Sequence, residues 1–127
     1  MKGSQKVIDV LNFLLADELT AVSQYMVHAE MCANWGYDEL AEKIEKRAID
    51  EMKHAEKHIG RILFFEAQPI VSNLNKMHIA PDVKAMLTSD HAAEEGAILE
   101  YNKAIKLCME EADNGTRVCY RAVDGLG

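Results

Sequence analysis

The sequence predicts an all-α protein, a bundle of three long helices joined by one short and one long connection. Long stretches are rich in Ala, Leu, Glu, Lys and Met, the residues that favour helix most. The only prolines, Pro69 and Pro81, lie close together and so interrupt the chain in one region. No segment alternates apolar and polar residues over the length of a strand, so we expect no sheet.

The first two helices are expected to form an antiparallel pair. The first extends over about residues 4–35, with Ser4 as a plausible N-cap and Gly36 positioned to close it. The second extends over about residues 38–65, with Asp38 as its N-cap candidate. Because only Gly36 and Tyr37 connect them, the two helices should be neighbours that run in opposite directions.

The third helix is expected to begin near Pro81 and Asp82 and to end at Asn114 and Gly115, with proline at the entrance and glycine at the exit. The connection before it, about residues 66–81, can reach roughly 50 Å when extended. A helix of about 27 residues is only about 40 Å long. The connection can therefore run the full length of the bundle, which leaves the third helix parallel to the second.

Composition limits the classes of function. A chain of 127 residues is the size of one domain, and its net charge of −7 argues against nucleic-acid binding and suits a protein that attracts cations. No apolar run approaches the roughly 20 residues of a membrane span, and the N-terminus lacks the apolar stretch of a secretory signal. Three cysteines are too few and too scattered for a disulfide scaffold, so we expect reduced thiols and a cytoplasmic location.

Each helix carries a glutamate near the middle of its apolar stripe: Glu18, Glu51 and Glu94. These carboxylates should lie at one depth in the bundle, where they repel each other unless a cation lies between them. His54 follows Glu51 by three residues and shares its face of the helix. Carboxylates with one imidazole suit iron or manganese. A single glutamate in such a stripe is more often a surface residue, but three in register with a Glu-x-x-His motif favour a metal site.

Several segments closely resemble the bacterioferritin family of the ferritin-like superfamily: residues 1–3 (Met-Lys-Gly), 34–36 (Asn-Trp-Gly) and 50–56 (Asp-Glu-Met-Lys-His-Ala-Glu). The resemblance implies a di-iron site in which Glu18 and Glu94 are lone carboxylates, Glu51 bridges the metals and His54 binds one of them. It further implies a ferroxidase, an Fe(II):oxygen oxidoreductase that uses oxygen or peroxide. The ferric product would be stored inside a homo-oligomeric shell of 24 subunits built from two-fold dimers.

The same resemblance implies haem b at the dimer interface, held by one methionine from each subunit, and Met52 matches that methionine. Met52 turns about 100° away from Glu51, toward a second apolar surface that also includes Leu19, Met26 and Ile49. A methionine at helical spacing is otherwise more often a packing residue.

Three further residues have smaller roles by resemblance. Tyr25 lies two turns beyond Glu18 and is similar to the tyrosine beside the di-iron centre, although a core tyrosine would look the same. His58, one turn beyond His54, is either a neighbour of the metal ligands or an interfacial histidine, which we favour. Asp50 could face the inner cavity and help iron pass inward.

The resemblance covers residues 1–117, which we take as a ferritin-like helical domain, and ends before a divergent tail at residues 118–127. At most about 12 residues follow Gly115, too few for a fourth helix of about 27 residues. We therefore expect the fourth helix to be truncated or absent, leaving three glutamates and one histidine of six expected ligands. This truncation leaves open whether the chain is only partly active.

Three other functions compete with iron storage. The chain could be a helical oligomerisation module without catalysis, in which the carboxylates never meet a metal. A di-iron peroxidase of the rubrerythrin type would usually add a Cys-rich module, which this sequence lacks. A DNA-protecting mini-ferritin would often carry a basic tail, which is also lacking.

Overall fold

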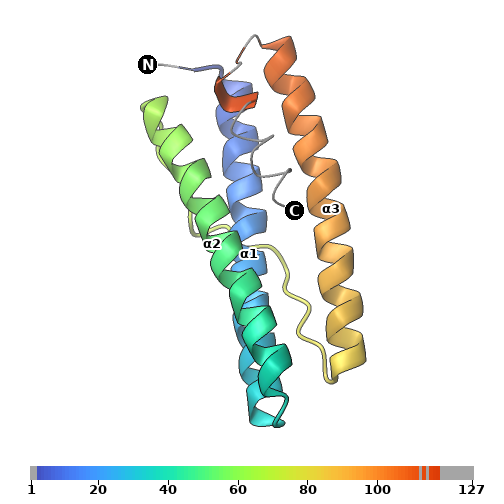
Figure 1. Ribbon diagram of the computed structural model, residues 1–127. Helices are drawn as coiled ribbons and strands as arrows, with labels where there is room; N and C mark the ends of the chain where they lie inside the picture. Colours follow the sequence, from blue (N-terminus) through green and yellow to red (C-terminus); the bar gives the residue numbers. More distant parts are fainter. Residues whose placement is uncertain (1–2, 112, 114, 118–127) are drawn as a thin grey trace.

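The computed structural model describes residues 3–111, 113 and 115–117, and within them it contains three long helices and no strand. They are α1 (Gln5–Asn34), α2 (Asp38–Phe64) and α3 (Val83–Glu110). In Figure 1, α2 and α3 run in the same direction and opposite to α1, with the crossover passing along the bundle between them. This arrangement confirms the all-α bundle with one long crossover. The tail expected at residues 118–127 lies outside the described residues.

The turn between α1 and α2 depends on Gly36. Its φ of 89° lies in the left-handed region, which glycine adopts without steric cost. This conformation lets the Tyr37 N–H donate to the Cys32 carbonyl at 2.9 Å and the Gly36 N–H donate to the Ala33 carbonyl at 3.0 Å. Tyr37, rather than Asp38, occupies the N-cap position of α2. Asp38 instead places its carboxylate in the first turn, where the helix dipole favours negative charge.

The core lies mainly between α1 and α2. Its apolar side chains form two clusters, one on each side of the level of Glu18: the first around Leu11, Leu15 and Ile62, the second around Tyr25, Ile44 and Met86. The backbone of α3 runs close to that of α1, whereas α3 reaches α2 through side chains such as Tyr101 and Glu94. Its buried stripe is narrow: Leu87 and Ile98, which share the helical spacing of Glu94, are 48% and 45% exposed. None of the described helices combines the length and apolar character that crossing a bilayer requires.

Polar side chains on α1 hold the crossover against the helix. Backbone N–H groups of the crossover donate to side-chain acceptors on α1: Ile70 to Asn12, Asn75 to Thr20, His78 to Gln24 and Ala80 to His28. The four distances lie between 2.8 and 3.2 Å. Because an extended segment has no internal partners for these N–H groups, the row on α1 fixes its path and thereby the end of the bundle at which α3 begins.

The C-terminal end of α3 differs from the expectation. The helix ends at Glu110 and not at Asn114 and Gly115, because Asp113 forms a cap for a further helical stretch at residues 115–117. The Asp113 carboxylate accepts from the Thr116 N–H at 3.0 Å and from the Thr116 hydroxyl at 2.7 Å. Arg61 of α2 donates to both residues and so joins this stretch to α2.

Candidate metal centre

Glu18 from α1 meets Glu51 and His54 from α2 in the middle of the bundle. One ligand atom from each of the three lies within 4.8 Å of the other two. The Nδ1 atom of His54 lies 3.8 Å from Oε2 of Glu18 and 3.5 Å from Oε2 of Glu51. The sequence placed these residues on facing stripes of two antiparallel helices, and the structure brings them together. We call these three residues the open cluster.

Burial and mutual repulsion perturb the charges of the open cluster. Burial, with a further contribution from Glu51, raises the pKa of Glu18 to about 8. Burial also acts to raise the pKa of Glu51, but His54, Glu18 and Arg47 outweigh it and hold that pKa below its ordinary value. The nearby carboxylates of Glu18 and Glu51 raise the pKa of His54 to about 9. The cluster therefore holds protons near neutral pH that a bound metal ion would displace.

The open cluster also leaves a polar atom unsatisfied. Within the described residues, the buried Oε2 of Glu18 has no hydrogen-bond partner, since His54 Nδ1 is too distant at 3.8 Å. Such an atom costs free energy unless a donor or a cation meets it. Two carboxylates and one imidazole form the oxygen-and-nitrogen donor set that iron or manganese prefers. The residues present therefore fit a metal ion.

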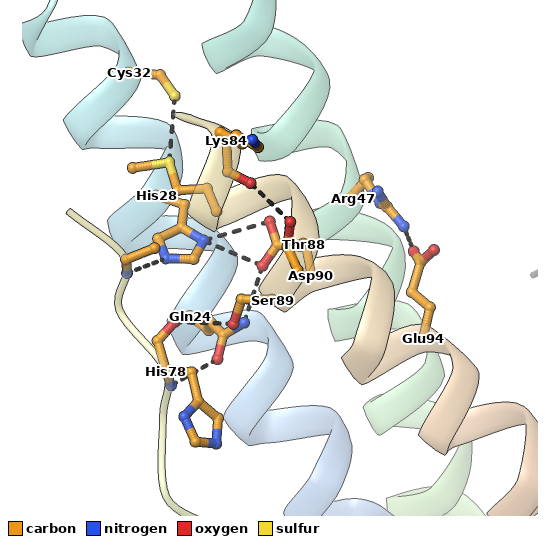
Figure 2. Close-up of polar contacts among 12 residues, drawn as sticks. Gln24, His28, Cys32, Arg47, His78, Lys84, Thr88, Ser89, Asp90 and Glu94 are labelled. Atoms are coloured by element: carbon orange, nitrogen blue, oxygen red, sulfur yellow. Dashed lines mark hydrogen bonds and ion pairs between the residues drawn. The ribbon is translucent and has the colours of Figure 1, made fainter. Parts of the chain in front are cut away.

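Glu94 lies beside the open cluster but not within it. Its carboxylate pairs with the guanidinium of Arg47, one turn before Glu51 on α2. The Glu94 side chain is about 40% exposed, in contrast to that of Glu18. Figure 2 shows Glu94 extending from α3 toward Arg47.

Two cavities border the open cluster. The first, about 410 Å³, is lined by residues of α1, α2, α3 and the crossover, among them Glu18, Tyr25 and Tyr101. The second, about 380 Å³, is lined by α2 residues and by Glu94. Glu51, His54 and Glu94 line both. An ion can therefore approach these side chains from two sides.

The remaining predicted residues occupy different surroundings. Tyr25 is buried, lines the first cavity and has its pKa raised by burial. Asp50 is exposed and lines the second cavity. Met52 is 45% exposed on α2, near the similarly exposed Ile49 and with Met26 exposed on α1. His58 is fully buried, and burial lowers its pKa to about 4.

The sequence did not predict the role of Tyr101. This α3 residue is buried, and its hydroxyl donates to Oε1 of Glu18 and lies 2.7 Å from Nε2 of His58. One signal was available. Tyr101 follows Glu94 by seven residues and His58 follows Glu51 by seven, so on parallel helices the two lie on the same side of the glutamates.

A second buried polar cluster, formed by Gln24, His28 and Asp90, also escaped the sequence analysis. The Asp90 carboxylate accepts from Gln24 Nε2 at 2.9 Å and lies 3.1 and 3.3 Å from His28 Nδ1 (Figure 2). The acceptor atoms of these two side chains, Oε1 of Gln24 and Nε2 of His28, accept hydrogen bonds from backbone N–H groups of the crossover. We call these three residues the closed cluster, since each side chain in it has its partners.

Comparison with known proteins places this architecture in a family. The model of the Ferritin-like domain matches residues 8–123. The bacterioferritin of Rhodobacter capsulatus is 42% identical over 113 residues, which are 89% of this chain and 70% of that protein. The chain belongs to the bacterioferritin family.

Other bacterioferritins agree with this assignment. The bacterioferritin of Brucella melitensis is 40% identical over 113 residues, which are 89% of this chain and 70% of that protein. The bacterioferritin of Mycolicibacterium paratuberculosis is 35% identical over 123 residues, which are 97% of this chain and 77% of that protein. Membership of the bacterioferritin family, together with the open cluster, supports iron as the metal and iron storage as the general role.

Proposed function

We propose that the chain is a ferroxidase, which oxidises Fe²⁺ to Fe³⁺ with oxygen or peroxide as the electron acceptor. The observation that supports this most directly is the unpartnered Oε2 of Glu18, which faces Glu51 and His54. A buried carboxylate oxygen with no donor is a poor structural element and a good ligand for a hard cation. Fe²⁺ is then the substrate that the open cluster binds.

In this proposal Glu18, Glu51 and His54 would hold iron from the positions they already occupy, and Glu51 would be the bridging carboxylate. Glu94 joins them by exchanging its ion pair with Arg47 for a bond to iron. Because an exposed ion pair contributes little to stability, breaking the pair with Arg47 requires little free energy. Asp50, Tyr25 and His58 surround the centre: Asp50 in the second cavity, Tyr25 in the first, and His58 behind Tyr101.

We further propose that copies of the chain assemble into the hollow 24-subunit shell of two-fold dimers, in the cytoplasm, with the ferric product inside. The exposed Met26, Ile49 and Met52 provide an apolar surface for a two-fold contact. Sedimentation analysis tests the shell: a single species of about 24 chains is expected, and a monomer at micromolar concentration contradicts it.

Haem b belongs to this two-fold contact. The thioether of Met52 is accessible at the surface, as an axial ligand shared across a dimer must be, so the residue fits the group. Met52 would hold the haem iron, and haem, when bound, supplies one-electron transfer. Titration with haem should give a bis-thioether absorption spectrum that Met52→Leu abolishes. Met109→Leu, at a similarly exposed methionine on α3, should leave that spectrum unchanged.

The ferroxidase proposal is tested by stopped-flow absorbance after Fe²⁺ is mixed with protein in air. A fast near-ultraviolet ferric signal that saturates at low iron per chain is expected. Glu51→Ala should slow this phase at least tenfold and reduce anaerobic Fe²⁺ uptake in calorimetry. Glu56→Ala, at an exposed position of α2, serves as the matched control. If the wild-type protein gives no acceleration over buffer, the chain is a helical oligomerisation module and not a ferroxidase.

A further inference from the structure

The two oxygens of Glu18 have different surroundings. Oε1 accepts the hydrogen bond from the Tyr101 hydroxyl, which reaches it from α3. Oε2 has no hydrogen-bond partner within the described residues and faces His54. A carboxylate can bind a metal through one oxygen or through both. The tyrosine occupies one of them in advance.

Tyr101 is itself held in place by His58. The Nε2 atom of His58 lies 2.7 Å from the Tyr101 oxygen, and the two rings are nearly parallel, with centroids 5.7 Å apart. A phenol has one hydrogen, and Tyr101 donates it to Glu18. When Glu18 is ionised, as a metal ligand must be, the phenol hydrogen goes to Glu18, and the Nε2–H tautomer of His58 donates to the phenol oxygen. The hydrogen bonds run in one direction, from His58 to Tyr101 to Glu18.

The three residues of this chain of hydrogen bonds are buried. Glu18, His58 and Tyr101 are 4% exposed or less, and they come from three different helices. A donor to the phenol oxygen makes the phenol a stronger donor in turn, which strengthens its bond to the carboxylate. Rotation of the carboxylate toward a bidentate mode would break the bond from Tyr101.

We propose that Tyr101, oriented by His58, is a positioning residue that reserves Oε1 of Glu18, so that this carboxylate binds a metal through Oε2 alone. The inference rests on the metal site proposed above. It concerns how Glu18 binds and not whether iron is oxidised, and it assigns Tyr101 and His58 a shared role. His58 would then act on the metal through two hydrogen bonds, whereas His54, one turn earlier, would bind the metal itself.

The test uses Zn²⁺, which is redox-inert, and infrared difference spectra recorded on metal binding to the full chain. The separation between the asymmetric and symmetric carboxylate stretches is wide for binding through one oxygen and narrow for binding through both. Glu18→Gln identifies the band of Glu18. Wild type should show a wide separation for that band, and Tyr101→Phe should narrow it while Zn²⁺ affinity changes by less than about tenfold, the scale of one charged hydrogen bond.

Two sets of variants control the experiment. Tyr37→Phe removes the hydroxyl of an exposed tyrosine that lines neither cavity and should leave the Glu18 band unchanged. His58→Phe should narrow the separation partly, and His58→Gln, which restores an N–H donor, should return it toward wild type. If circular dichroism shows that Tyr101→Phe does not fold, the two His58 variants test the positioning role in its place.

The outcomes are distinct. An unchanged Glu18 band in Tyr101→Phe, or in both His58 variants, overturns the positioning role while leaving the metal site intact. A wild-type chain that does not bind Zn²⁺ overturns the metal site itself, and this inference with it.

Discussion

The bundle contains two buried clusters of acidic and histidine side chains, and they solve the problem of burial in opposite ways. In the closed cluster, the Asp90 carboxylate has two side-chain partners, and Gln24 and His28 each also accept a backbone N–H of the crossover. In the open cluster, Oε2 of Glu18 has no hydrogen-bond partner within the described residues and the pKa of Glu18 is raised to about 8. Similar residue types thus form a structural joint at one level and a candidate metal site at the next.

The difference shows that burial of charge does not by itself indicate function. Both clusters contain a carboxylate that is 4% exposed or less and a histidine from another helix. The clusters differ in whether the protein itself supplies hydrogen-bond partners for the oxygens of the buried carboxylate. Four substitutions, each in one cluster or beside it, test this difference.

The largest effect is expected from Asp90→Ala. This change leaves Gln24 Nε2 and His28 Nδ1 buried without an acceptor, which should lower the free energy of unfolding by about 3 kcal/mol. Urea denaturation followed by circular dichroism measures it. Glu45→Gln, at an exposed position of α2, should change stability by less than about 0.5 kcal/mol. A loss below about 1 kcal/mol for Asp90→Ala would mean that the closed cluster is not a structural joint.

Glu18→Gln should weaken metal binding while leaving the stability of the protein nearly unchanged. Glutamine keeps an oxygen for Tyr101 and introduces no buried charge, so the free energy of unfolding of the metal-free protein should change by less than about 1 kcal/mol. Zn²⁺ affinity should fall at least tenfold, as measured by calorimetry. A stability loss as large as that of Asp90→Ala would place Glu18 among structural residues.

A smaller effect is expected from Arg47→Gln, which frees Glu94 from its ion pair. With its carboxylate released, Glu94 should contribute to metal binding at lower cost, so Zn²⁺ affinity should rise by about two- to fivefold. Lys46→Gln removes the same charge from the adjacent exposed position and controls for the general change in electrostatics. Equal affinities in the two variants would show that Arg47 does not restrain Glu94.

The smallest effect is expected from Thr20→Val. The hydroxyl of Thr20 accepts from the Asn75 N–H at 2.8 Å, at the edge of the first cavity. Water can replace this partly buried bond, so the loss of stability should be about 0.5 kcal/mol. Amide hydrogen exchange at Asn75 should nevertheless accelerate. Unchanged exchange there would mean that the α1 side chains do not hold the crossover.

Much of the fold follows from local sequence. Helix-forming composition, Gly36 at the first turn and the two prolines around the crossover determine the three helices and their directions. The burial of α3 did not follow, because which face of a helix is covered depends on its neighbours. Leu87 and Ile98 have the helical spacing of a core stripe, but of the described helices only α1 has its backbone close to α3.

The candidate site was predictable to the extent that it depends on two helices with a short connection. Glu18, Glu51 and His54 were placed together from stripe positions on α1 and α2. Contacts to α3 depend on its rotation and its distance from the pair, which no stripe specifies. The partners of Glu94 and Tyr101, namely Arg47 and Glu18, are therefore findings of the structure.

The row of acceptors on α1 has a consequence for how copies of the chain can associate. Asn12, Thr20, Gln24 and His28 are bonded to the crossover, so that side of α1 is already occupied by the chain's own backbone. A neighbouring molecule approaching along it would meet the crossover and never the helix. Direct contact with α1 from outside is left to the rows that contain exposed side chains such as Met26 and Val27.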